Sequence, residues 1–104
     1  MIKAMYTAAS GMQSQQTEVD VIANNLANVQ TAGFKKSMTN FEDMLYVTTR
    51  EPGARTASGA AIAGLQVGSG SRLVSTSKVF TEGAPVPSGG QFDLTIRGDG
   101  FFEV

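Results

Sequence analysis

Residues 2–34 read IKAMYTAASGMQSQQTEVDVIANNLANVQTAGF, and this stretch decides the fold. Mainly apolar residues recur in it at alternating spacings of three and four, the heptad pattern of a helix that packs along a seam. The apolar seam consists of Ile2, Met5, Ala9, Met12, Gln16, Val19, Ala23 and Leu26, widened by Tyr6, Ile22 and Val29. Gly33 favours the left-handed conformation that ends a helix, and Phe34 follows as its hydrophobic contact. The pattern predicts one helix of about 30 residues, roughly 45 Å long.

The surface of this predicted helix is poor in charge. Only Lys3, Glu18 and Asp20 are charged among the first 34 residues. A solvated helix normally carries Glu–Lys pairs, whereas uncharged amides suit a helix that is surrounded by other helices. An ordinary amphipathic core helix with a neutral outer face is the alternative, and we favour the surrounded helix. The predicted assembly residues are Ile2, Met5, Met12, Val19, Ile22 and Leu26. Asn24, Asn25 and Asn28 are the predicted polar ties, that is, residues whose side-chain amides hydrogen-bond between helices of the assembly.

Composition limits what the chain can be. It has 104 residues, a net charge of −1, and 43 residues that are Gly, Ala, Ser or Thr, so few large side chains remain for a core. With no Cys and no His, the chain lacks thiolate nucleophiles, the commonest metal ligand and the usual general base near pH 7. Balanced charge gives no basic stripe for nucleic acid, and no apolar run reaches the ~20 residues of a membrane-spanning helix. We therefore predict no catalytic, cofactor-binding or metal-binding residue, no cofactor, and no nucleic-acid or small-molecule partner.

The middle of the chain predicts a short helix followed by an arm. Thr39-Asn40-Phe41-Glu42 fits a capping box, and Phe41 and Leu45 then lie on one helical face. Residues 51–64 are rich in Gly and Ala with almost nothing to pack, which is typical of a flexible arm. The predicted junction residues are Gly33, Phe34, Phe41 and Leu45, and the predicted arm residues are Arg50, Pro52 and Arg55.

The last third of the chain predicts β structure. We expect residues 72–81 to form one mixed strand, and residues 91–97 alternate, with Phe92, Leu94 and Ile96 pointing inward. A turn at residues 98–100 then leads into a return strand. The predicted fold is α+β, with a long coiled-coil-type helix, a short helix, an extended arm and an incomplete β-rich domain. Its divisions are the helix at 1–34, the junction helix and arm at 35–64, and the truncated start of the β-rich domain at 65–104.

Two functions fit these patterns. One is a structural subunit whose heptad helix is completed by helices of other chains. The other is a membrane-active protein whose amphipathic helix inserts at a bilayer surface. Interfacial helices usually place Lys and Arg on the polar face and Trp, Phe or Leu on the other, whereas residues 2–34 hold a single Lys and no Arg. The structural subunit is therefore the favoured prediction.

Residues 23–35, ANNLANVQTAGFK, resemble the signature of the bacterial flagellar rod and hook family, the axial proteins of the basal body. Gln30 stands where the family commonly has Asn. The resemblance extends over essentially the whole chain, through DVI at 20–22, FEDMLY at 41–46, REPGA at 50–54, GLQVGSG at 64–70 and the stretch 93–102. In this family, a stretch like residues 46–63 is characteristic of the distal part of the rod.

The resemblance implies a structural subunit that self-assembles into a rigid helical tube. In the family, terminal helices form an inner coiled-coil layer, and a β-rich domain lies outside it. The implied function is transmission of torque from motor to hook, with the bore of the tube forming part of the export channel. The implied partners are further copies of the chain, other rod proteins, the hook protein, the surrounding ring proteins and the flagellar type III export apparatus. A proximal rod or hook subunit is the alternative within the family.

The resemblance also implies a location and a length. Family members lie in the basal body, which spans the periplasm, and are exported without a cleaved signal peptide. They continue well past the position of Val104 and end in a second long helix. We therefore expect the native chain to be longer, with much of its apolar surface buried between chains.

Overall fold

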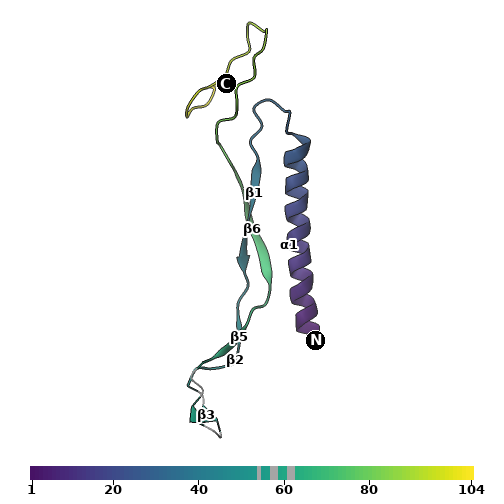
Figure 1. The fold of residues 1–104 in the computed structure, drawn as a ribbon, viewed down its shortest axis with the longest axis vertical. Coiled ribbons are helices and arrows are strands. Elements are labelled where there is room, and N and C mark those ends of the chain that lie inside the picture. The colour runs from purple at the N-terminus through teal and green to yellow at the C-terminus, as the bar shows by residue number, and fades with distance from the viewer. Residues whose placement is uncertain (54, 57–58, 61–62) are drawn as a thin grey trace.

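A single helix and a long β-hairpin lie side by side and make up most of the chain (Figure 1). The computed structural model describes residues 1–53, 55–56, 59–60 and 63–104. Its elements are α1 (Ile2–Ala27), β1 (Ser37–Asp43), β2 (Val47–Arg50), β3 (Arg55–Thr56), β4 (Gly59–Ala60), β5 (Leu65–Val67) and β6 (Ser71–Lys78). Sequence reasoning was therefore correct about a mixed fold that begins with one long helix.

Helix α1 has 26 residues and ends before the predicted position. Its C-cap is Asn28, at φ −102° and ψ 15°. The side-chain amide nitrogen of Asn28 donates to the Asn24 backbone carbonyl oxygen at 2.9 Å, and its side-chain amide oxygen accepts from the Thr31 hydroxyl at 3.1 Å. Such local side-chain bonds compete with the backbone hydrogen bonds of a helix, and this explains why α1 ends earlier than predicted. Gly33 does adopt a left-handed φ of 74°, but it lies in the turn that follows the helix.

The six strands pair as three nested antiparallel ladders, so that they form one long hairpin. β1 pairs with β6 from Ser37↔Lys78 to Asp43↔Ser71, with a bulge between Asn40 and Phe41. β2 then pairs with β5, and β3 with β4. Figure 1 shows the β3 end of this hairpin extending beyond the N-terminal end of α1. The strand predicted at 72–81 is confirmed as far as Lys78, where β6 ends, and residues 79–81 are not part of it.

The predicted short helix after Thr39 is wrong, because this stretch belongs to strand β1. The expected capping residue, Glu42, lies opposite Arg72 in the ladder and forms an ion pair with it. Asn40 donates from its side-chain amide to the Ser75 hydroxyl at 3.2 Å. Cross-strand pairs with a segment about 30 residues away thus replace the local capping bonds.

The arm is more regular than predicted where it is described. β2 and β5 form its base, and β3 and β4 pair further out. Positions 54, 57–58 and 61–62 of the predicted arm lie outside the described residues.

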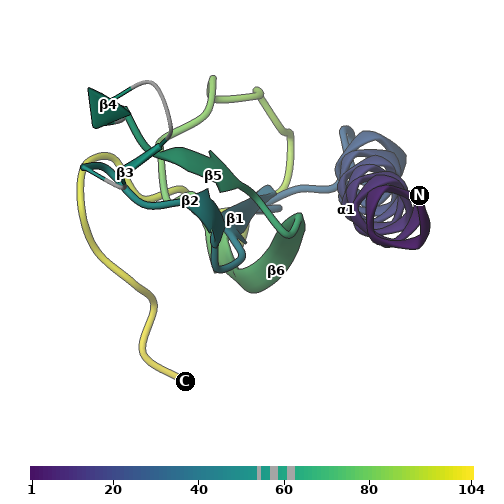
Figure 2. The same ribbon diagram turned by 90° about the horizontal axis from the view of Figure 1, so that it is seen from below.

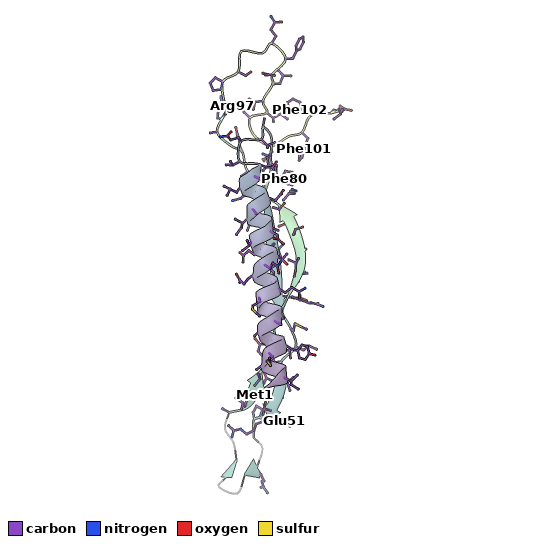
Figure 3. All side chains as sticks on the ribbon, turned by 90° about the vertical axis from the view of Figure 1, so that its right-hand side faces the viewer. Met1, Glu51, Phe80, Arg97, Phe101 and Phe102 are labelled. Atoms are coloured by element: carbon purple, nitrogen blue, oxygen red, sulfur yellow. The ribbon has the colours of Figure 1, made fainter. Side chains whose placement is uncertain are left out.

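The strand predicted at 91–97, with its return strand, is wrong: residues 79–104 contain no helix or strand. Phe92 and Leu94, expected to point inward, are 92% and 74% exposed. An isolated two-stranded hairpin is marginally stable in water, and these residues have no further strand to pack against in this chain. The rings of Phe80 and Phe101 meet edge to face, 5.8 Å apart between centroids. Figure 3 shows this aromatic pair beyond the C-terminal end of α1.

The chain has no hydrophobic core of its own in the part that the structure describes. None of those residues is buried. The radius of gyration is 23.6 Å and the extents are 82 × 28 × 23 Å, whereas a compact chain of this length has a radius of ~13 Å. The accessible surface is 9146 Å², against ~5,600 Å² for a compact monomer of this mass. A chain with this much exposed surface has a large apolar area left to bury elsewhere.

Candidate assembly interface

Helix α1 turns its polar side, not its apolar side, toward its own hairpin. Its half-buried residues form a hairpin face of Thr7, Ser10, Gly11, Ser14, Thr17, Glu18, Val21 and Asn25. At about 100° per residue, this face and the apolar seam lie on roughly opposite sides of the helix. Figure 2, which looks along the helix, shows α1 beside β6 and β1 with its far side uncovered.

The hairpin face makes small, polar and close contacts. The side chain of Asn25 bonds twice to the backbone of Ser37: its amide nitrogen donates to the carbonyl oxygen at 2.9 Å, and its amide oxygen accepts from the N–H at 3.0 Å. The hydroxyl oxygens of Ser14 and Ser71 are 3.1 Å apart. These bonds hold α1 in one rotation about its axis.

Gly70 allows the closest approach of hairpin and helix. A Cβ atom there would lie 3.3 Å from the Cβ of Ser10 and would overlap the Ser10 hydroxyl. Gly70 also has a φ of 116°, a conformation that favours glycine. Its carbonyl oxygen accepts from the N–H of Met44 at 2.8 Å, which closes the ladder between β1 and β6. A side chain at this position would force the Ser10 hydroxyl to rotate away and the helix to shift by a few tenths of an ångström, and it would strain the backbone.

Replacing Asn25 with Ala is expected to loosen the docked helix. Loss of two hydrogen bonds costs about 2 kcal/mol, so the Ser37 amide should exchange with solvent about 30-fold faster. Hydrogen exchange followed by NMR or mass spectrometry measures this rate. Asn24→Ala is the matched control, because Asn24 is exposed and its amide oxygen only accepts a long 3.4 Å bond from Asn28. Equal Ser37 exchange in Asn25→Ala and the unaltered chain would contradict the assigned contact.

The apolar seam faces solvent along the whole of α1. The six large seam residues that were predicted from the sequence are between 55% and 72% exposed. They are Ile2, Met5, Met12, Val19, Ile22 and Leu26. A continuous apolar stripe of this length is unusual on a monomer and marks an interaction surface.

The three predicted polar ties are placed differently from one another. Asn25 faces its own hairpin, and Asn28 bonds within the turn that ends the helix. Asn24 is exposed. The structure therefore does not bring the three amides together on the seam, and their role between chains stays a prediction.

The predicted junction residues also separate. The Lys78 ammonium lies 5.6 Å from the centroid of the half-buried Phe34 ring, at one end of the hairpin. Phe41 lies further along, opposite Leu73 in the ladder. Leu45 is 88% exposed. Phe34 thus sits where the helix turn meets the hairpin, while Leu45 is left for contacts outside the described chain.

The base of the arm is closed by a tight contact around Gly64. A Cβ atom at Gly64 would lie 2.8 Å from Pro52 Cδ and 2.9 Å from the Arg50 carbonyl oxygen. Arg50 is also the last residue of β2 and pairs with Leu65. The predicted arm residue Arg55 begins β3, further out. The two sides of the arm therefore already touch at residues 52 and 64.

Tyr46 lies between the end of β1 and the start of β2, where the β1–β6 ladder gives way to the β2–β5 ladder. The Asp43 carboxylate raises the pKa of the Tyr46 phenol above its ordinary value of 10.0, first by accepting a hydrogen bond from it and second by its negative charge. A Cβ atom at Gly68 would lie 3.3 Å from Tyr46 Cε1, so glycine leaves room for the ring. Tyr46 thus ties the arm base to the end of β1.

Asp43→Asn is expected to lower the pKa of Tyr46 toward its ordinary value, because an amide oxygen accepts the phenol hydrogen bond more weakly than a carboxylate and because the negative charge is removed. Since the raised pKa favours the protonated phenol in the folded chain, the contact stabilises at neutral pH and is lost as pH rises through that pKa. Absorbance titration in a Tyr6→Phe background follows Tyr46 alone, because the chain has two Tyr residues. An unchanged titration midpoint in Asp43→Asn would contradict the contact.

Sequence reasoning missed the hairpin face. A search for small residues at helical spacing finds its N-terminal part, which consists of Thr7, Ser10, Gly11, Ser14 and Thr17, but not Glu18, Val21 or Asn25. In the part of the chain that the structure describes, no cluster of His, Cys, Asp or Glu is arranged to hold a metal ion. No described helix is long and apolar enough to cross a membrane.

Comparisons with known proteins relate the chain to flagellar rod and hook proteins. The sequence model of the family described as flagella basal body rod protein matches residues 5–35. The flagellar basal-body rod protein FlgG of Borreliella burgdorferi is 43% identical over 105 residues, covering 100% of this chain and 40% of that protein. FlgG of Bacillus subtilis is 40% identical over 107 residues, covering 100% and 39%. The flagellar hook protein FlgE of Borreliella burgdorferi is 37% identical over 102 residues, covering 98% and 23%. The chain spans about two-fifths of the length of the rod proteins that it matches.

Proposed function

The chain belongs to the bacterial flagellar rod and hook family, and from this premise we propose that it is a structural subunit of the basal-body rod. Within the rod, we assign it to the distal part, where copies form a rigid helical tube. The tube passes torque from the motor to the hook, and its bore forms part of the export channel. Several rod relatives at 36–43% identity over nearly the whole chain support this assignment.

The exposed apolar seam is the observation that carries the proposal. The hairpin face is already occupied within the chain, so the seam is free to pack on helices of other chains. Burial of apolar surface drives most protein association, and this chain buries none of its described residues completely. A subunit whose hydrophobic core forms between chains is expected to expose an apolar surface of this kind before it assembles.

The three divisions of the chain have separate roles in the proposal. Residues 1–34 form the axial helix of an inner coiled-coil layer. Residues 35–64 form the junction and the distal-rod arm as strands in place of the expected helix, and β1 and β2 pair with β6 and β5 of the third division. Residues 65–104 begin the outer β-rich domain.

The partners and the location follow from the same assignment. The seam contacts further copies of the chain, and the ends of the tube contact other rod proteins and the hook protein. Ring proteins surround it in the periplasm, and the flagellar export apparatus delivers the subunit without a cleaved signal peptide. The role is structural rather than enzymatic, in keeping with relatives that are named as rod proteins.

A hook subunit is the second candidate, because one hook protein is 37% identical over 98% of the chain. Immunogold labelling of purified hook–basal bodies separates the two. We expect label on the rod between the ring levels, and deletion of the gene should leave basal bodies without a distal rod. Label along the hook would favour the second candidate, and label on neither structure would overturn both.

A further inference from the structure

We propose that Met5 and Met12 form an oxidation site that controls assembly of the free chain: conversion of their thioethers to sulfoxides blocks packing along the apolar seam. This inference rests on the proposed function, since it takes the seam to be the surface that other chains cover. It concerns the chain before assembly, when both sulfur atoms are open to solvent.

The two methionines lie in one column of α1. Met5, Met12, Val19 and Leu26 are seven residues apart, so their side chains follow one another along one side of the helix. Met5 is 71% exposed and Met12 is 69% exposed. Half of the large side chains in this column are therefore methionines that solvent reaches freely.

The other internal methionines provide a comparison within the same chain. Met38 belongs to β1 and Met44 follows it, and they are 50% and 40% exposed. Both lie on the hairpin and outside the column of Met5 and Met12, although Met38 lines a shallow pocket together with Ile22. Met1 is fully exposed and precedes the helix.

The chemistry requires a two-electron oxidant, which we take to be a peroxide. Hydrogen peroxide transfers one oxygen atom to the methionine sulfur. The O–O bond breaks, an S–O bond forms, the sulfur is oxidised by two electrons, and the peroxide leaves as water. Methionine sulfoxide reductases reverse the change.

A sulfoxide in the column would oppose burial of the seam. It turns a flexible apolar side chain into a polar one with a strong acceptor oxygen. Apart from Gln16 and Tyr6, the seam residues carry no side-chain donor for that oxygen, so burial of a sulfoxide among them costs free energy that burial of a thioether does not. In an assembled rod the same sulfur atoms would be covered, and oxidation should be slow.

Oxidation of the purified full chain tests the proposal. The chain is treated with hydrogen peroxide, quenched with catalase, and followed by sedimentation and electron microscopy of the rods. Peptide mass spectrometry locates the sulfoxides. We expect assembly to fall about tenfold or more, and Met5 and Met12 to carry less sulfoxide when rods are treated after assembly.

Paired variants identify the responsible residues. The double variant Met5→Leu/Met12→Leu is expected to assemble after peroxide treatment, whereas Met38→Leu/Met44→Leu should fail as the unaltered chain does. Loss of assembly in peroxide-treated Met5→Leu/Met12→Leu, equal to that of the unaltered chain, would overturn the proposal.

A second pair keeps the proposal testable without oxidant. Met5→Gln/Met12→Gln places polar groups in the column and is expected to block assembly, while Met38→Gln/Met44→Gln is expected to permit it. Normal assembly of Met5→Gln/Met12→Gln would also overturn the proposal. Leu26→Asp separates this inference from the proposed function: if Leu26→Asp assembles, the seam itself is not the interface. If Leu26→Asp fails while the Gln and sulfoxide forms assemble, only the oxidation site is wrong.

Discussion

Cells in which Leu26 of this protein is replaced by Asp are expected to build no distal rod and to lose swimming. Leu26 is 70% exposed on α1, at the end of the apolar seam. Packing of the seam against other helices would bury a carboxylate with no cation beside it, which costs at least several kcal/mol per subunit. Because every subunit in a helical tube repeats the same contact, no copy escapes this cost. Soft-agar swimming and electron microscopy of basal bodies measure the result.

The matched control for this prediction is Leu26→Met, which keeps an apolar side chain of similar volume and should assemble and swim. Leu26→Asp should leave most of the helix content of the free chain in place by circular dichroism, because the side chain is exposed there and the unfavourable charge acts only on the last turn of α1. This separates a defect in assembly from a defect in folding. A Leu26→Asp strain that builds a motile filament would show that the seam is not the interface.

Deletion of residues 53–63 is expected to leave the β1–β6 ladder intact and to give bent or softened rods. The deletion joins Pro52 to Gly64, and these residues already approach within contact distance. The β2–β5 pairs therefore need little movement to close the shortened arm. Rods are expected to lose rigidity because the arm, which is characteristic of the distal rod in this family, is removed from every subunit along the tube. Electron microscopy of isolated rods measures their curvature.

The control for the deletion is a Gly/Ser sequence of equal length in place of residues 53–63. Equal bending in the deletion and in the Gly/Ser variant would assign rigidity to the side chains of the arm, whereas straight Gly/Ser rods would assign it to arm length. Hydrogen exchange of the β1–β6 amides confirms that the ladder is kept. Straight and fully rigid rods from the deletion would contradict the role of the arm.

Local pattern predicted some elements well and failed where distant segments compete. The three-and-four spacing predicted α1 because helical periodicity is a property of the stretch itself. Thr39–Glu42 has the local pattern of a helix start, yet Glu42 pairs with Arg72 across the hairpin, and the ladder prevails over the capping bonds. The alternation at 91–97 is a strand pattern without a partner strand in this chain, so it forms no strand here.

The sequence by itself determined that α1 would form, that its apolar residues would share one side, and that the chain would be too poor in large side chains to enclose them. Only the tertiary structure decided which side of α1 the hairpin covers. Gly70 lets the strands approach at Ser10, and Asn25 satisfies the backbone of Ser37, so the small and polar side fits closely against the hairpin. The bulky apolar side cannot make those close contacts. It faces outward, where its apolar side chains stay in contact with water until a further helix covers them.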